Sequence, residues 1–191
     1  MPFFARKCEL TEFYNMTPCC HIIQAKILTI NILGVRKMKF IERETFSICG
    51  YAVETTAAQN DKDVSGLYKD FFEKDKEAVL RRLRGTKTGY FGLSWYTQGH
   101  EKYCYLLGIE VSQENEPPEN ALIKTLEKTL YAVACYPHNK DIKEAWTDFF
   151  YTDIPNKGYA PDEPYNFYFE YYPESVKGDY ELWVPVVKAN A

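Results

Sequence analysis

The chain contains one structural unit twice, and this repeat limits the possible folds more than any other feature of the sequence. The segment KDVSGLYKDFF at 62–72 matches KDIKEAWTDFF at 140–150, with a constant offset of 78 residues. Both copies keep a Lys-Asp pair, an aliphatic residue, an aromatic residue and a final Asp-Phe-Phe. Two further matches flank this pair: GYAV at 50–53 with LYAV at 130–133, and YLLGIEV at 105–111 with YELWVPV at 180–186. Such recurrence predicts two copies of one supersecondary unit, at about 40–113 and 120–188.

Each copy is predicted to run strand, helix, strand, strand. In the first copy, 46–54 is a strand, and Asp61 or Asp63 can cap a helix that Gly85 follows. The helix has apolar residues at the spacing of one buried face: Val64, Leu67, Tyr68, Phe71, Phe72, Val79 and Leu83. A pair of strands follows at 90–96 and 103–111.

The second copy is predicted to begin with one long strand at 123–136. Asn139 or Asp141 then caps a helix that Pro155 and Gly158 end. The aromatic strand 165–172 and a last strand at 179–187 complete it, with Pro185 placing the last strand near an edge or a bulge. The sequence therefore predicts an α+β fold, with two strand-helix-strand-strand repeats related by a pseudo-twofold axis. We expect an antiparallel sheet with the helices on one face and a ligand groove on the other face, between the repeats.

Residues 1–37 share no pattern with the repeats, and Met38 begins a new segment, so we expect an N-terminal extension of uncertain role at 1–37 and one domain at 38–191. The extension is either upstream sequence read through to Met1, or an arm that covers an exposed edge or another subunit. Its apolar run at 21–35 is too short and too polar to cross a bilayer. Acidic residues before that run also make it a poor signal peptide.

Composition excludes several classes of function. A net charge of −4 argues against a nucleic-acid binder. Three scattered histidines and six cysteines without a Cys-x-x-Cys pair predict no metal site and reduced cysteines, as in a cytoplasmic protein. The sequence shows no catalytic triad and no phosphate-binding loop, and it implies no cofactor. The surplus of aromatic residues, 16 Tyr and 12 Phe, is typical of pockets and interfaces that are half buried and half wet.

The segment YNFYFEYY at 165–172 has one carboxylate within an aromatic strand. Because side chains alternate along a strand, Phe167, Phe169 and Tyr171 share one face, and Glu170 lies on the other face with tyrosines. A carboxylate surrounded by tyrosines suits a flat organic cation. The alternative is a solvated glutamate on an open sheet face.

The predicted ligand-binding residues are Glu170, Trp95, Tyr168, Tyr172, Trp183 and Glu181. For each aromatic residue, ordinary packing is the alternative, and Glu181 can lie on a rim instead of in the site. Glu110 is assigned to solvent. No catalytic residue is indicated, apart from Glu170 if the protein is a hydrolase.

Together, the repeat, the motif at 105–111, Phe169-Glu-Tyr171 and the motif at 180–186 resemble the GyrI-like small-molecule-binding domain, also called the AraC-type effector-binding domain. The resemblance covers 38–188. It implies a cytoplasmic bacterial module that binds organic ligands, often cationic and lipophilic, in a groove between the repeats. It also implies that a buried glutamate, here Glu170, faces the ligand's positive charge. Family regulators carry a helix-turn-helix domain in front of this module, and the 37 residues here have no such pattern, so the resemblance implies a stand-alone member.

Three functions follow as hypotheses. The first is a non-enzymatic, multidrug-type binding protein for lipophilic, drug-like cations, which the residues favour. The second, which only the family resemblance implies, is a hydrolase of cyclopropane-bearing genotoxins, in which Glu170 directs water with help from Trp95 or a tyrosine. The third is a gyrase-protecting interaction protein. The expected partner is a small organic ligand, without direct nucleic-acid or membrane contact, and a homodimer or a separate protein partner stays open.

Overall fold

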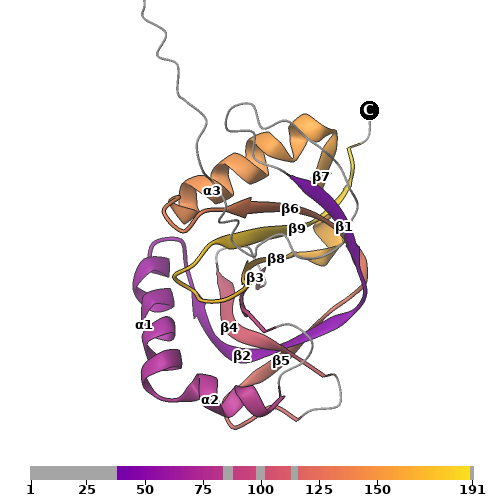
Figure 1. Cartoon of the computed structure of the whole chain (residues 1–191). Helices are drawn as coiled ribbons and strands as arrows, with labels where there is room; N and C mark the ends of the chain where they lie inside the picture. Colours follow the sequence, from indigo (N-terminus) through magenta and orange to yellow (C-terminus); the bar gives the residue numbers. More distant parts are fainter. Residues whose placement is uncertain (1–37, 84–87, 98–101, 113–115, 190–191) are drawn as a thin grey trace, which may run out of the picture. The chain divides into compact units, whose positions relative to one another are not determined.

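The computed structural model describes residues 38–83, 88–97, 102–112 and 116–189, which all belong to one unit of the chain. Residues 1–37 and Gly85 lie outside the described residues, as do the predictions made for them. The strands of the main sheet lie in the order β1-β6-β9-β8-β3-β4-β2-β5, and every pairing is antiparallel (Figure 1). Their bounds are β1 Lys39–Arg43, β2 Phe46–Thr55, β3 Tyr90–Tyr96, β4 Tyr103–Val111, β5 Leu122–Leu126, β6 Thr129–Tyr136, β8 Phe167–Tyr172 and β9 Tyr180–Lys188. The short strand β7, Tyr159–Pro161, pairs with β9.

The order of the strands confirms the tandem repeat. The equivalent strands of the two copies lie in the same order when the sheet is followed inward from its two ends. From the ends to the centre, β1 corresponds to β5, β6 to β2, β9 to β4 and β8 to β3. The pseudo-twofold axis therefore passes between the central strands β3 and β8. Each copy also places its first strand against the other copy, because β1 pairs with β6 and β5 pairs with β2. The first strand of each repeat is therefore hydrogen-bonded to the other repeat within one sheet.

Two details of the strand prediction are wrong. The predicted strand 123–136 is two strands, β5 and β6, because the chain between them crosses from β2 at one end of the sheet to β1 and β9 at the other. The proposed match of 50–53 with 130–133 is out of register. Tyr51 packs on the helix side of the sheet with Phe71, whereas Tyr131 packs on the opposite side with Trp183.

The helices follow the predicted positions, with different ends. Helix α1 spans Asn60–Glu73 with Gln59 as its N-cap, so neither Asp61 nor Asp63 is the cap and both lie in the first turn. Asp75, at a φ of 53°, breaks the predicted helix before α2, Lys76–Leu80, and a 3-10 turn, Arg81–Leu83.

Helix α3 spans Ile142–Asp148 and is followed by a π-helical turn, Phe149–Asp153. Asp141 caps α3 as predicted, because its side chain accepts hydrogen bonds from the backbone N–H groups of Lys143 and Glu144. None of the helices described has the length and hydrophobicity that spanning a membrane requires.

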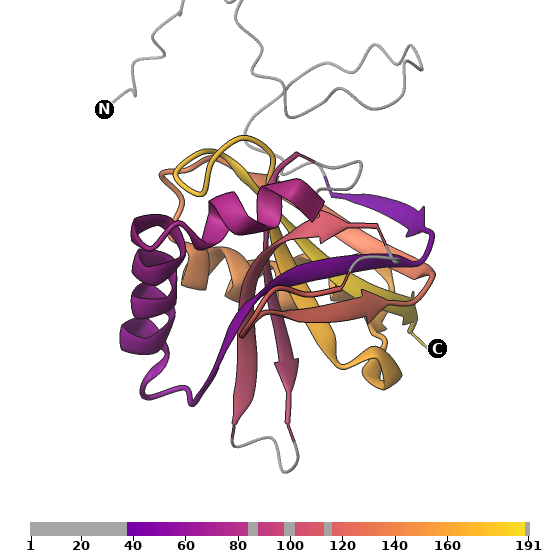
Figure 2. The same cartoon turned by 90° about the horizontal axis from the view of Figure 1, so that it is seen from below.

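The sheet is strongly curved, and alternation along its strands separates two kinds of packing (Figures 1 and 2). On the concave side, residues such as Phe91, Phe169 and Trp183 form one buried core. On the convex side, α1 with α2 and α3 with its π-turn cover separate halves of the sheet, with Phe71 and Phe149 as their buried anchors. The prediction that the helices share one face is confirmed.

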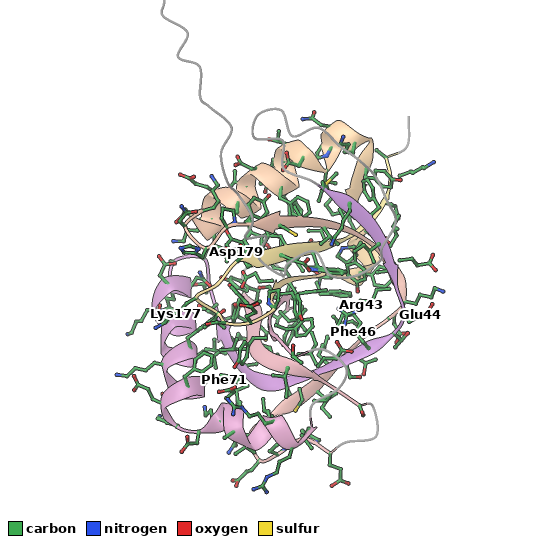
Figure 3. All side chains as sticks on the ribbon, viewed as in Figure 1. Arg43, Glu44, Phe46, Phe71, Lys177 and Asp179 are labelled. Atoms are coloured by element: carbon green, nitrogen blue, oxygen red, sulfur yellow. The ribbon has the colours of Figure 1, made fainter. Side chains whose placement is uncertain are left out.

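The concave core also buries an ion pair that the sequence did not reveal. Glu110 was assigned to solvent, but it is buried and pairs with Arg43 at 2.7 Å. The Arg43 guanidinium lies 3.3 Å from the ring centre of Phe46 (Figure 3). This cation–π contact offsets part of the cost of desolvating the guanidinium. Arg43 comes from β1 and Glu110 from β4, so the curvature of the sheet brings these charges together.

Candidate functional site

A cavity of about 1010 Å³ lies between the two helices and the central strands of the sheet. Its walls come from α1, including Asp61 and Tyr68, and from α3, including Lys143 and Trp146; its floor comes from β3, β4 and β8. The expectation of a groove on the face opposite the helices is therefore wrong. The concave face is closed by its own aromatic core, whereas α1 and α3 cover different halves of the convex face and leave the space between them open.

Glu170 lies at the floor of this cavity on β8, beside the pseudo-twofold axis. It is 7% exposed, and its two carboxylate oxygens accept hydrogen bonds from three side chains. Tyr105 on β4 donates to Oε2 at 2.7 Å and Tyr172 donates to the same oxygen at 3.1 Å. Trp146 on α3 donates from Nε1 to Oε1 at 3.0 Å. Donors from both the sheet and a helix therefore fix the carboxylate in one orientation.

The repeat explains why one residue from each helix belongs to this network. Tyr68 on α1 and Trp146 on α3 occupy matching positions of the 78-residue offset. Trp146 reaches Glu170 directly, and Tyr68 reaches it through Tyr105, whose hydroxyl lies 2.9 Å from that of Tyr68. The two helices thus direct equivalent aromatic side chains toward the single carboxylate near the axis.

Burial raises the pKa of the Glu170 carboxyl, and the hydrogen bonds from Tyr105, Trp146 and Tyr172 partly oppose this shift. Within the part of the chain that the structure describes, no lysine, arginine or histidine is paired with Glu170. Burial also raises the pKa values of Tyr68, Tyr105 and Tyr172, and the negative charge of Glu170 raises them further. These tyrosines therefore stay protonated and act as donors. When Glu170 ionises, the site holds one negative charge that has no counter-ion among the described residues.

Gly92 provides the space that this arrangement needs. It lies on β3 directly opposite Glu170 in the pairing of β3 with β8. A Cβ atom at this position would lie 2.1 Å from the Tyr105 hydroxyl and 2.5 Å from Glu170 Oε2. The absence of a side chain at Gly92 therefore lets Tyr105 on β4 and Glu170 on β8 meet across β3, the strand between them.

Three of the predicted site residues come together. Tyr168 and Tyr172 line the cavity with Glu170, and Tyr168 packs against Phe150, with ring centres 4.8 Å apart. Trp95 also borders the cavity, but its ring packs against the concave core, with Lys124 Nζ 5.1 Å from the ring centre. Trp95 is thus a rim residue whose side chain faces mostly away from Glu170.

Trp183 and Glu181 do not join this group, which corrects the expectation that they share a site with Glu170. Both lie on the concave side of the sheet because strand alternation on β9 directs them away from the helices. Trp183 stacks on Phe169 with ring centres 5.4 Å apart, and its Nε1 donates to Glu181 Oε2 at 2.9 Å.

Sequence reasoning missed Trp146, Tyr68 and Tyr105. Tyr68 was assigned to the buried face of its helix and Trp146 was not singled out, although their matching repeat positions could have indicated that both approach the axis. Nothing in the sequence indicated that Tyr105 lies opposite Glu170, because that contact depends on the order of β4, β3 and β8. The described residues contain no group of three His, Cys, Asp or Glu side chains that could hold a metal ion.

A family model described as integron-associated effector binding protein matches residues 39–186. The chain belongs to this family. This effector-binding domain covers both repeats and includes the cavity and Glu170, in line with the GyrI-like resemblance of the sequence. No curated protein sequence matches the chain.

Solved structures with the same fold are similar to this effector-binding domain over most of its length. SAV2435 bound to tetraphenylphosphonium matches with a TM-score of 0.67 and 14% identity, covering 79% of this chain and 94% of that one. An integron cassette protein from Vibrio cholerae matches with a TM-score of 0.53 and 18% identity, covering 78% and 95%. The C-terminal domain of EcmrR matches with a TM-score of 0.57 and 11% identity, covering 82% and 100%. At these identities the likeness establishes the fold.

Proposed function

We propose that this effector-binding domain binds lipophilic organic cations of drug-like size in the cavity between α1 and α3, with Glu170 as the counter-charge. The observation that carries the proposal is a buried carboxylate that accepts three hydrogen bonds but has no cationic partner among the described residues. A buried charge without a counter-ion is costly, and a bound cation would supply the missing positive charge. The proposal includes multidrug binding, because the aromatic side chains in the lining offer ring surface that ligands of different shapes can contact.

The lining of the cavity supports an aromatic, positively charged ligand. Trp146, Phe150 and Tyr168 contribute ring surface beside Glu170, and a desolvated cation–π contact contributes about 0.5–2 kcal/mol. A volume of about 1010 Å³ is at the upper end of typical small-molecule sites, so ligands with several rings fit. The similarly folded SAV2435 is bound to tetraphenylphosphonium, a lipophilic cation, which supports the same class of ligand here.

Cation affinity is expected to rise with pH. The pKa of Glu170 is raised, so at low pH the folded protein carries a protonated, neutral Glu170 that attracts cations weakly. As the pH passes through this pKa the carboxylate forms, and affinity for a permanently charged dye increases and then levels off.

In the absence of ligand, the raised pKa of Glu170 makes the folded protein less stable as the pH rises. The free energy of unfolding falls as pH rises from the unfolded to the folded pKa, because the folded state holds the proton more tightly.

Fluorescence titration of a cationic rhodamine across a pH series measures this dependence. The matched control is the Glu170→Gln variant, which cannot ionise and is expected to show a flat profile. A wild-type affinity that does not change with pH, or a profile that the variant shares, would contradict the role given to Glu170.

The hydrolase hypothesis uses the same residue, and the site favours binding over catalysis. Three donors already occupy the Glu170 oxygens, an arrangement that stabilises negative charge and leaves little room for an activated water molecule. Incubation with a cyclopropane-bearing alkylator, followed by mass spectrometry, separates the two functions. The binding proposal expects the compound to be recovered unchanged. A ring-opened, hydrated product that is absent with Glu170→Gln would establish the hydrolase instead.

We also propose that residues 38–191 form the ligand-binding domain of a cytoplasmic bacterial protein. The described cysteines, Cys49, Cys104 and Cys135, are thiols and not disulfides, which supports a reducing compartment. Burial raises the pKa of Cys49 to about 11, so this thiol is unreactive and serves packing.

A further inference from the structure

The rim of the cavity carries a second carboxylate that is already bound to an ammonium group. Asp61 in the first turn of α1 and Lys143 in the first turn of α3 both line the cavity. Lys143 Nζ lies 2.7 Å from Asp61 Oδ2, so the pair joins the two helices that form the walls. The Lys143 and Asp61 side chains are 66% and 73% exposed, in contrast to the buried Glu170. The cavity therefore has one carboxylate at its floor and another at its mouth.

We propose that Asp61 forms an outer cation subsite and that the cavity takes elongated organic dications, with one positive group at Glu170 and the other at Asp61. This inference rests on the proposed function for the inner group. The ammonium of Lys143, on its flexible four-carbon stem, occupies the outer subsite in the free protein. It carries the same positive charge as the second head group of such a ligand.

Lys143 is held weakly enough for a ligand to replace it. An ion pair between two largely exposed side chains contributes little free energy, because water and salt screen the charges and both side chains lose freedom. Breaking the pair leaves Lys143 in solvent, where its charge is hydrated. A ligand already anchored at Glu170 presents its second charge to Asp61 at a high effective concentration, which favours the exchange.

Aromatic side chains line the cavity together with the two carboxylates. Tyr103 on β4 donates a hydrogen bond to Asn60, the neighbour of Asp61, and its ring centre lies 6.2 Å from that of Tyr96. Tyr103 and Tyr96 both line the cavity, and burial raises the pKa of the Tyr103 hydroxyl. An apolar spacer can follow this wall, and the exposed ring of Tyr151 at the mouth can stack on the outer cation.

The test compares bis(trimethylammonium)alkanes with single-headed alkyltrimethylammonium ions of the same chain length, in competition with a bound rhodamine. Dications are expected to bind more tightly than their single-headed partners at one range of spacer lengths. Lys143→Gln frees Asp61 and is expected to increase this dication preference by about 3–10-fold, while Asp61→Asn removes it. The readout is the ratio of the two affinities, because loss of a nearby positive charge strengthens the binding of every cation.

Lys102→Gln is the matched control. Lys102 forms a similar exposed ion pair with Glu54, at 2.8 Å, and neither residue lines the cavity, so its loss is expected to leave the ratio unchanged. If neither Lys143→Gln nor Asp61→Asn alters the ratio of dication affinity to single-headed cation affinity, the outer subsite is overturned. In that case single-headed cations would still bind, and their binding would still depend on Glu170. Failure of every cation to bind would overturn the proposed function itself.

Discussion

Replacing Glu170 with glutamine is expected to weaken the binding of lipophilic cations by about 100-fold, which corresponds to about 2.7 kcal/mol. Glutamine keeps the size of the side chain and one acceptor oxygen, but it carries no charge. The loss therefore measures the attraction between the ligand's positive charge and the carboxylate at the cavity floor. Fluorescence titration with a cationic rhodamine gives the two dissociation constants.

Stability is expected to change in the opposite direction from affinity as pH rises. Because the pKa of Glu170 is raised, ionisation makes the folded wild-type protein less stable, and the glutamine variant avoids this cost. The free energy of unfolding of Glu170→Gln relative to wild type should thus increase with pH. A loss of affinity with this stability profile cannot come from misfolding.

Glu181→Gln is the matched control for that experiment. Glu181 is also buried and also accepts a hydrogen bond from a tryptophan, Trp183, but it lies on the concave side of the sheet. Its replacement is expected to leave cation affinity within a factor of about 2, since it does not line the cavity. Equal losses in both variants, or no loss in Glu170→Gln, would show that the charge of Glu170 is not the determinant.

Replacing Gly92 with alanine is expected to damage both the site and the fold. The new methyl group would lie within 2.5 Å of the Tyr105 hydroxyl and Glu170 Oε2, so one or both side chains must move and the hydrogen bond between them must break. Forcing an extra methyl group into a packed region costs about 1–3 kcal/mol of stability. We expect cation affinity to fall by about 10-fold or more at a temperature where circular dichroism shows the variant to be folded.

Two other glycines provide the controls. A methyl group added to Gly66 on α1 would enter open space, with nothing to meet within 4 Å, so Gly66→Ala should raise stability by about 0.5–1 kcal/mol through helix propensity. Gly108 lies on β4, paired with Gly50 on β2, and it does not line the cavity. A methyl group at Gly108 would lie 2.3 Å from the Cys49 carbonyl oxygen. Gly108→Ala should therefore destabilise the protein without a specific loss of affinity. Wild-type cation affinity in Gly92→Ala would refute the requirement for an empty position opposite Glu170.

The repeat accounts for most of what the sequence could predict. Matching the segments at 62–72 and 140–150 gave the order of elements, the pseudo-twofold relation and the α+β class, because two equal units can share one sheet in few ways. Alternation along β8 also placed Glu170 on the face opposite Phe169, since the period of a strand is fixed by its backbone. These predictions depended on local geometry.

Predictions that depended on the curvature of the sheet and on its strand order failed. The groove was assigned to the wrong face because the sequence does not show that the concave side closes on itself around residues such as Phe169 and Trp183. Glu110 was assigned to solvent because its partner, Arg43, is 67 residues away in sequence. Tyr105 was missed because it is also far from Glu170 in sequence. Their contact depends on the strand order, which places Gly92 between them.

The most direct test of a cation-selective cavity compares two ligands of the same size and shape but opposite charge, tetraphenylphosphonium and tetraphenylborate. Isothermal titration calorimetry with the wild-type protein should show binding of the phosphonium cation and at least about 100-fold weaker binding of the borate anion. The Glu170→Gln variant should bring the two affinities closer together. Equal affinities in the wild-type protein, or a difference that persists unchanged in the variant, would contradict a cavity whose selectivity comes from one buried carboxylate.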